Sequence, residues 1–336
     1  MNRLNDIIVK TGFILLVSPI LLNAQISNNL SEIPRIDVHA HIGSIERMHE
    51  YVRVAEILRE EFKRDLAIWI DLRAPLEPGG EGIEFLNEVR DTFNGRFLLC
   101  LNDYTIDDGL RFSPEELAEW YARGVAGYKI WVGVSPLVDN PANGPTFTKM
   151  EQLGLPGASI HISQPYPTEW CDDPVKFWEA HNAWERVLDR HPRLSVVNAH
   201  MLDHFYSDEQ LDYLRYILDT YPHVNVDLAA RFQQFHRMDR ENLRDFMIQY
   251  ADRILFGTDI SGLPEGGRYE QTAERYFRCF QLLETDGMIE GGFFGNTPTR
   301  GLALPVDVLE KIYFRNAVRL YPGVKEALES LGYAVK

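Results

Sequence analysis

Two histidines stand one residue apart near the start of the chain, in the segment Asp37-Val38-His39-Ala40-His41. Side chains two positions apart on a β-strand point to the same face, so a strand here would direct both imidazoles the same way. Two neutral imidazoles about one pleat apart can bind one divalent cation. His39 and His41 are therefore candidate metal ligands, although an H-x-H pair alone is not specific.

Other polar residues lie in or at the ends of later apolar segments. They are Lys129, His161, His200 and Asp259. A lysine, histidine or aspartate buried in a strand is costly unless it is paired or coordinated. One such residue could be a satisfied core group, but buried polar residues recur in five segments when the segment of His39 and His41 is included. The pattern indicates a single polar site assembled from several strands.

The elements that must position these residues are short apolar segments alternating with amphipathic helical patterns. Strands are predicted over residues 35–40, 66–72, 96–101, 126–132, 159–163, 194–199, 224–229 and 253–258. Helices are predicted over 48–64, 81–93, 113–123, 174–190, 208–221, 240–250 and 271–283, with 306–320 and 324–331 closing the bottom or flank. This order favours an α/β fold, a (β/α)8 TIM barrel with extra C-terminal helices, over a doubly wound sheet.

Active sites of such barrels lie where the carboxyl ends of the strands meet. The polar residues would then share one rim. Long irregular stretches are expected over residues 133–157, 260–267 and 286–305. Residues 133–157, which follow the fourth strand, are the best candidate for a lid.

The N-terminus predicts an export signal. Arg3 and Lys10 precede an apolar run over residues 11–22, and Ala24 offers a small residue for cleavage. An uncleaved anchor fits less well because the run is too short to span a bilayer. We therefore expect a signal peptide over residues 1–24, one domain over residues 25–336, and a periplasmic or secreted location.

Charge and cysteine content restrict the partners. The formal charge of the chain is −16, and removal of residues 1–24, with Arg3, Lys10 and Asp6, leaves −17. This charge argues against nucleic acid or an anionic membrane surface as a partner. The partner that we expect is a small-molecule substrate. The three cysteines form no zinc or redox pattern and are expected to be buried thiols. A homo-oligomer is compatible with the sequence, which does not reveal the oligomeric state.

Four local signatures resemble the amidohydrolase superfamily, and within it the amidohydrolase-2 group of metal-dependent TIM-barrel proteins. They are Ile36-Asp37-Val38-His39-Ala40-His41, Gly154-Leu155-Pro156 shortly before His161, Asp252-Arg253-Ile254-Leu255-Phe256-Gly257-Thr258-Asp259, and Arg315-Asn316-Ala317-Val318-Arg319-Leu320. The resemblance covers about residues 36–322. It is specific for the family but not for a substrate.

The resemblance implies a ligand set for a divalent metal, which we expect to be Zn²⁺, as one ion or two. His39, His41, His161 and Asp259 would bind the metal, and Asp259 would also accept the proton of the attacking water. His200 would orient that water or bind a second metal. Some branches of the superfamily carry a carbamylated lysine on the fourth strand that bridges two metals, so Lys129 is a candidate carbamate bridge.

Three residues keep alternative interpretations. Lys129 without carbamate could contact a substrate carboxylate or pair with an acid such as Asp259. Arg231, just after the seventh predicted strand, could bind an anionic substrate group or form an ion pair at the rim. Trp131 shares the strand face of Lys129 and could form a pocket wall or pack under the lid.

The resemblance predicts a hydrolase that uses a metal-activated water to cleave an amide, a lactone or an ester. The alternative is a metal-dependent non-oxidative decarboxylase, because relatives on the same scaffold include such lyases. A binding or scaffold protein that has lost catalysis is a third hypothesis. It is disfavoured because every expected metal position carries a competent residue.

Overall fold

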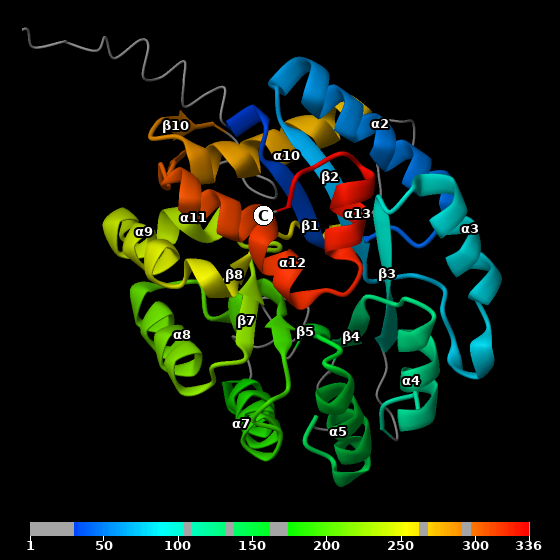
Figure 1. Ribbon diagram of the computed structural model, residues 1–336. Helices are drawn as coiled ribbons and strands as arrows, with labels where there is room; N and C mark the ends of the chain where they lie inside the picture. Colours follow the sequence, from blue (N-terminus) through cyan, green and yellow to red (C-terminus); the bar gives the residue numbers. More distant parts are fainter. Residues whose placement is uncertain are drawn as a thin grey trace, which may run out of the picture.

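Nine strand segments form one parallel sheet, and Figure 1 shows helices arranged around it. The computed structural model describes residues 30–103, 109–131, 138–161, 174–261, 268–290 and 297–335. The strands are β1 (Pro34–His41), β2 (Asp65–Asp71), β3 (Phe97–Asp103), β4 (Gly127–Trp131), β5 (Gly157–His161), β6 (Val196–Asn198), β7 (Val224–Asp227), β8 (Ile254–Leu255) and β9 (Ile260–Ser261). Their order in the sheet is β8-β7-β6-β5-β4-β3-β2-β1-β9.

The sheet closes through its last two segments. β8 pairs with β7 and β9 pairs with β1, so together they act as one split eighth strand. On one side, the Leu228 N–H donates to the Leu255 carbonyl at 3.1 Å, and on the other, the Val38 N–H donates to the Phe256 carbonyl at 3.0 Å. The predicted (β/α)8 barrel is confirmed.

The helices that follow the strands surround the barrel (Figure 1). They are α2 (Ile45–Phe62), α3 (Ile83–Phe93), α4 (Pro114–Ala122), α5 (Gly144–Leu153), α7 (Pro174–Arg190), α8 (Asp208–Thr220), α9 (Arg240–Gln249) and α10 (Tyr269–Glu284). All of them except α5 match a predicted helix. The Ser113 capping box with Pro114 at the helix start, a signal visible in the sequence, is present at α4.

The prediction of a lid over residues 133–157 is wrong for its central part, which forms α5. Phe147 and Met150 are buried, and the Phe147 ring lies 6.4 Å from that of Trp184 on α7. Gly144-Pro145 indicated a loop, but proline is well tolerated in the first turn of a helix. This segment is therefore the ordinary barrel helix between β4 and β5. Residues 132–137 lie outside the described ranges.

The C-terminal helices pack at one end of the barrel, as predicted. They are α11 (Val306–Glu310), a π-helical turn (Lys311–Arg315), α12 (Asn316–Leu320) and α13 (Val324–Ser330). The Phe256 N–H donates to the Ile312 carbonyl at 2.9 Å, and the Asn316 side-chain amide donates to the Ile254 carbonyl at 2.8 Å. These bonds anchor the helices where β8 begins, at the end of the barrel opposite the carboxyl ends of the strands.

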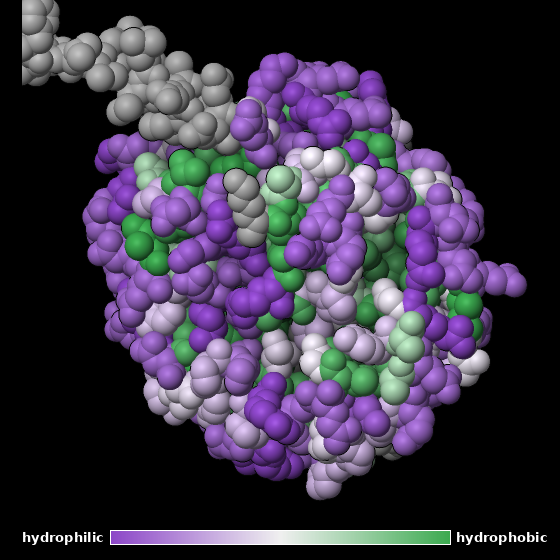
Figure 2. All heavy atoms as spheres, in the orientation of Figure 1, coloured by the Kyte–Doolittle hydropathy of each residue, from purple (hydrophilic) through white to green (hydrophobic). Residues whose placement is uncertain are grey.

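The remaining described features are peripheral. A short hairpin of β10 (Met288–Ile289) and β11 (Thr299–Arg300) lies within the stretch expected to be irregular. Cys100 and Cys279 are buried free thiols, as predicted, while Cys171 and the predicted signal peptide lie outside the described residues. No helix in the described ranges is both long and apolar enough to cross a membrane. Figure 2 shows that hydrophilic residues dominate the visible face.

Candidate metal centre

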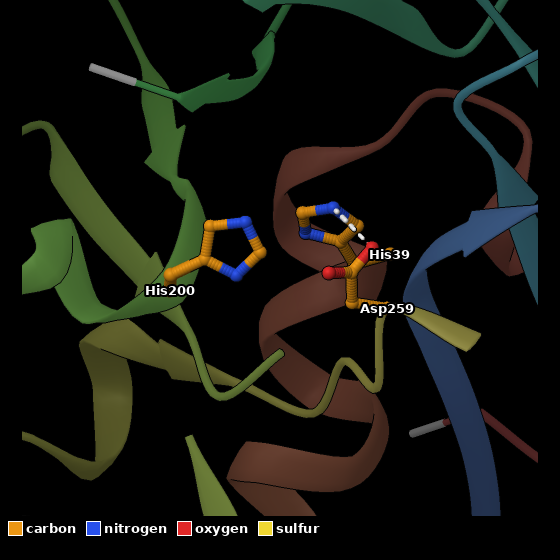
Figure 3. Close-up of side chains that lie close together, drawn as sticks. All are labelled: His39, His200 and Asp259. Carbon is orange, nitrogen blue, oxygen red and sulfur yellow. Dashed lines mark ion pairs between the residues drawn. The ribbon is translucent and has the colours of Figure 1, made fainter. Parts of the chain in front are cut away.

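Three side chains from distant parts of the chain converge at the carboxyl ends of the strands. His39 lies on β1, His200 follows β6, and Asp259 stands between β8 and β9. One ligand atom of each lies within 4.8 Å of the others, and Figure 3 shows the three side chains close together. The His39 and His200 rings are 4.8 Å apart, and His39 Nε2 lies 3.7 Å from Asp259 Oδ1.

His41 lies beside this group. Its Nε2 is 3.0 Å from Asp259 Oδ1, and its ring centroid is 5.1 Å from that of His39. The two histidines that the H-x-H spacing singled out are thus close together, although the strand register shifts between Asp37 and Ala40. His41 is 12% exposed at its side chain and His39 only 1%, so His41 is the more accessible of the pair.

Asp227 at the end of β7 connects two of these residues, and sequence reasoning missed it. Its Oδ2 lies 2.8 Å from His39 Nδ1, and its Oδ1 accepts hydrogen bonds from the backbone N–H groups of His200 (2.9 Å) and Ala229 (3.1 Å). Burial opposes ionisation of Asp227, but the charges and hydrogen bonds of its histidine neighbours outweigh burial and lower its pKa to about 2. The carboxylate therefore holds Nδ1 of His39 and directs Nε2 toward the site.

His200 is oriented in the same way by a backbone carbonyl. Its Nδ1 lies 2.9 Å from the Ala229 carbonyl oxygen, which can only accept a hydrogen bond. The proton is therefore on Nδ1, and Nε2 is the ring atom that can act as a metal ligand. Burial lowers the pKa of His200 to about 4, so its imidazole is neutral near pH 7.

The site is built on strained backbone. Residues 200–203 have φ values of 59°, 55°, 56° and 56°, and Ala230 and Asp259 have φ values of 51° and 62°. The left-handed conformation of a non-glycine residue costs about 1–2 kcal/mol relative to the right-handed conformation. Strain of this kind concentrates at functional sites, where surrounding contacts hold it in place. Here it occurs after β6, after β7 and before β9, on the same rim.

Two residues next to the group fix the distance between β1 and the split eighth strand. Asp37 Oδ1 accepts from the N–H groups of His39 and Thr258, both at 3.0 Å, and Asp37 Oδ2 accepts from the hydroxyl groups of Thr258 (2.5 Å) and Tyr276 (2.7 Å). Gly257 leaves room for the site, since a Cβ there would lie 3.0 Å from the Cβ of His39. The motif Phe-Gly-Thr-Asp therefore combines a packing role with a candidate metal ligand, Asp259.

Lys129 points into the barrel without a partner among the described residues. Its side chain is 1% exposed, and its Nζ has no hydrogen bond there. Burial lowers its pKa to about 8, against the attraction of the nearby aspartates. No carboxylate of the described residues lies at ion-pair distance from Nζ. The interpretation of Lys129 as the ion-pair partner of Asp259 is therefore wrong.

The other residues predicted for the site have different outcomes. Arg231 is buried and forms an ion pair with Asp203, so the ion-pair alternative is present. Trp131 is half-buried at the end of β4. His161 is the last residue of β5 and pairs in register with Trp131, but its side chain lies outside what the structure describes.

Several known proteins resemble this chain in sequence profile or in fold. A family profile described as Amidohydrolase matches residues 84–323, more than half of the chain. Two similar structures are an uncharacterised TIM-barrel protein from Bordetella bronchiseptica (16% identity, 94% of this chain and 93% of that chain, TM-score 0.50) and a Staphylococcus aureus protein assigned as an amidohydrolase (14%, 86% and 99%, TM-score 0.50). A 5-carboxyvanillate decarboxylase from Sphingomonas paucimobilis also matches (12%, 86% and 99%, TM-score 0.46). A comparison with curated proteins found no match.

Proposed function

The chain belongs to the amidohydrolase family, and from this premise we propose that it is a metal-dependent hydrolase that cleaves a C–N or C–O bond of a small molecule such as an amide, a lactone or an ester. The observation that carries the proposal is the convergence of His39, His200 and Asp259, whose ligand atoms lie within 4.8 Å of one another. The set lies at the carboxyl ends of the barrel strands, and enzymes with this fold have their active sites there.

The donor set fits a divalent cation. In both buried histidines Nδ1 is bound to an acceptor, which leaves Nε2 as a donor atom, and Asp259 adds a carboxylate oxygen. Two imidazoles and one carboxylate are a known catalytic zinc set, although manganese or iron would accept the same ligands. We propose Zn²⁺, with His41 and His161 as further ligands that the family resemblance implies.

The chain's own residues would supply proton handling and orientation. When bound, the metal would lower the pKa of water and polarise the scissile carbonyl group. Burial disfavours ionisation of Asp259, but the hydrogen bond from His41 and the charges of the neighbouring histidines hold its pKa far below the usual range. Asp259 is therefore ionised and partly exposed. The family resemblance implies that its carboxylate would accept the proton of the attacking water. If Nε2 of His200 does not bind the metal, it would instead accept a hydrogen bond from the attacking water.

Metal content and turnover test this proposal directly. The purified protein should contain a divalent metal and hydrolyse at least one member of a panel of amides, lactones and esters. His39→Ala combined with His41→Ala should abolish both, and unchanged metal content in that variant would show that the site is wrong. Metal-dependent CO2 release from aromatic or enoic acids, without hydrolytic turnover, would establish the decarboxylase alternative instead.

The role of Lys129 is a separate proposal. Its amine is buried and has no hydrogen bond among the described residues, and it would suit a carbamate that bridges two metals. A metal stoichiometry near two that falls to one in Lys129→Ala would support this assignment. A stoichiometry of one in both proteins would leave Lys129 as a candidate contact for a substrate carboxylate, with Trp131 as a candidate pocket wall.

We also propose that the protein is exported after cleavage of residues 1–24. The support is the charged and then apolar pattern of the N-terminus. Sequencing the N-terminus of protein recovered from the periplasm or the medium should begin at Gln25. An intact Met1 in that protein, or its confinement to the cytoplasm, would contradict export.

A further inference from the structure

We propose that Arg231 and Asp203 are positioning residues for His200. Their ion pair holds residues 200–203 in a left-handed turn, and that turn places the His200 imidazole beside His39 and Asp259. The inference rests on the proposed function only in taking this site to bind a metal. The contacts of Arg231 with residues 200–203, which we call the clamp, are observed independently of that function.

The turn has a conformation that its sequence does not favour. His200, Met201 and Leu202 have φ/ψ values of 59°/36°, 55°/36° and 56°/24°, and Asp203 follows with a φ of 56°. This region suits glycine, and residues with a Cβ normally visit it singly. Four successive non-glycine residues would relax to a right-handed conformation without outside contacts. The turn is therefore held by its neighbours.

Arg231 supplies contacts at both ends of the turn. Its Nε–H donates to the carbonyl of His200 at 3.0 Å, and its Nη2 forms an ion pair with Oδ1 of Asp203. Its Nη1 donates to the carbonyl of Ala230 at 2.9 Å. The planar guanidinium thus joins the first residue of the turn to the last, a geometry that the single ammonium of a lysine cannot reproduce.

Burial makes this clamp strong. Arg231 is 8% exposed and Asp203 3%. A buried charge that loses its partner is left unsolvated, so breaking one side of such a pair is far more disruptive than breaking a surface pair. Both partners also follow strands of the barrel, since the turn comes after β6 and Arg231 comes after β7. The clamp consequently ties together the two loops that carry the contacts of His200.

The position of the imidazole depends on these two loops. His200 donates its backbone N–H to Asp227, and its Nδ1 is bound to the carbonyl of Ala229, two residues before Arg231. If residues 200–203 relaxed, the ring would leave Ala229, and Nδ1 would no longer be fixed as the protonated nitrogen. The clamp therefore acts on the tautomer and direction of His200, through which it affects metal binding.

A direct contact with an anionic substrate is the competing role of Arg231. Three of its N–H groups already bind protein acceptors, which favours the clamp. The two roles differ in a testable way. A substrate contact involves Arg231 alone, whereas a clamp requires Asp203 equally.

The test compares Arg231→Met, Asp203→Asn and the double variant with the unaltered full chain. Arg237→Met is the matched control, because the Arg237 guanidinium lies over the same Tyr206 ring, at 5.7 Å against 5.2 Å for Arg231. The first readout is the 15N spectrum of labelled histidines, in which His200→Gln identifies the His200 signals. The second is the affinity for Zn²⁺ measured by competition with a chelator.

We expect the unaltered protein to show His200 protonated at Nδ1. Both single variants should convert this signal to a mixture of tautomers and weaken Zn²⁺ binding by about 10–100-fold, as loss of an orienting group does at metal sites. The double variant should be no worse than Arg231→Met, because that single variant already breaks the ion pair with Asp203. Arg237→Met should change neither readout, and Arg231→Lys should have a smaller effect than Arg231→Met.

An unchanged His200 signal and unchanged Zn²⁺ affinity in the clamp variants would overturn the proposal. So would a rise in KM for an anionic substrate in Arg231→Met with no effect of Asp203→Asn, which would identify a substrate contact. If Arg231→Met fails to fold, Asp203→Asn and Arg231→Lys give the same comparison. Absence of hydrolytic turnover in the unaltered protein would count against the proposed function alone, since neither readout uses turnover.

Discussion

Asp227 shows how one carboxylate can order two histidines that are far apart in the sequence. It binds Nδ1 of His39 at 2.8 Å and the backbone N–H of His200 at 2.9 Å. We predict that Asp227→Asn weakens Zn²⁺ binding by about 10–100-fold while the protein stays folded. The amide keeps an oxygen acceptor for the backbone but loses the charge that favours a donor at Nδ1 of His39.

Metal affinity and circular dichroism together test this prediction. The exposed Asp245 on α9 provides the matched control, Asp245→Asn. Equal Zn²⁺ affinity in Asp227→Asn and Asp245→Asn would mean that the carboxylate does not orient the ligand.

Gly257 matters for the space it leaves empty. A Cβ at this position would lie 3.0 Å from the Cβ of His39 and 3.4 Å from that of Asp227. Gly257→Ala should therefore push β1 and β7 away from the eighth strand, lower stability by about 1–3 kcal/mol and weaken metal binding. Gly287→Ala is the control, since a Cβ there meets nothing within 4 Å. Chemical denaturation and zinc competition measure both effects, and identical values for the two variants would refute the argument.

The sequence identified the polar residues that converge at the rim better than the residues that orient them. His39, His41, His200 and Asp259 were found because strand-end polar residues in apolar segments are visible locally. Asp227 has the same local signal, at the end of Val-Asn-Val-Asp, but its role depends on a contact across the barrel with a residue 188 positions away. The left-handed turn was not predictable, because residues 200–203 contain no glycine.

At the scale of elements, the split eighth strand is held to β1 by the carboxylate of Asp37. Thr258 donates both its backbone N–H and its hydroxyl to this group. Thr258→Val removes the hydroxyl but preserves the shape of the side chain, and we predict a loss of about 1–3 kcal/mol in the free energy of unfolding. The reason is that buried Asp37 loses a hydrogen-bond donor where β1 meets the split eighth strand and the barrel closes.

Denaturant unfolding of the metal-free protein isolates this effect from metal binding. Thr148→Val on the surface of α5, where the hydroxyl only bonds within its own helix, should change stability little. If Thr258→Val and Thr148→Val unfold at the same denaturant concentration, the contact of Thr258 with Asp37 does not stabilise the junction between β1 and the split eighth strand.

Element boundaries show where local signals suffice. α4 was predicted because its capping box and N-terminal proline are explicit in the sequence. α5 was missed because Gly144-Pro145 and polar residues hid a helix whose burial comes from Phe147, Met150 and their neighbours on α7. Tertiary packing therefore overrode weak local propensity at α5.

At the scale of the whole molecule, barrel topology followed from the count and order of strands, because right-handed parallel connections leave few alternatives. The way in which the barrel closes did not follow from the sequence. It depends on β8 pairing with β7 and β9 pairing with β1 on either side of Gly257, Thr258 and Asp259. The break in the eighth strand also carries Asp259, a candidate ligand, so barrel closure and the candidate metal centre share the same few residues.

A metal held at this point would link strands from three parts of the barrel. His39, His200 and Asp259 belong to β1, to the turn after β6 and to the break between β8 and β9. Because the unfolded chain does not present this set together, binding stabilises the native state, by about 4 kcal/mol when free metal is a thousandfold above Kd. We predict that chelation lowers Tm and that added Zn²⁺ restores it. His200→Ala should show a much smaller Zn²⁺-dependent shift, and an equal Tm with and without metal in the unaltered protein would contradict a metal centre at this rim.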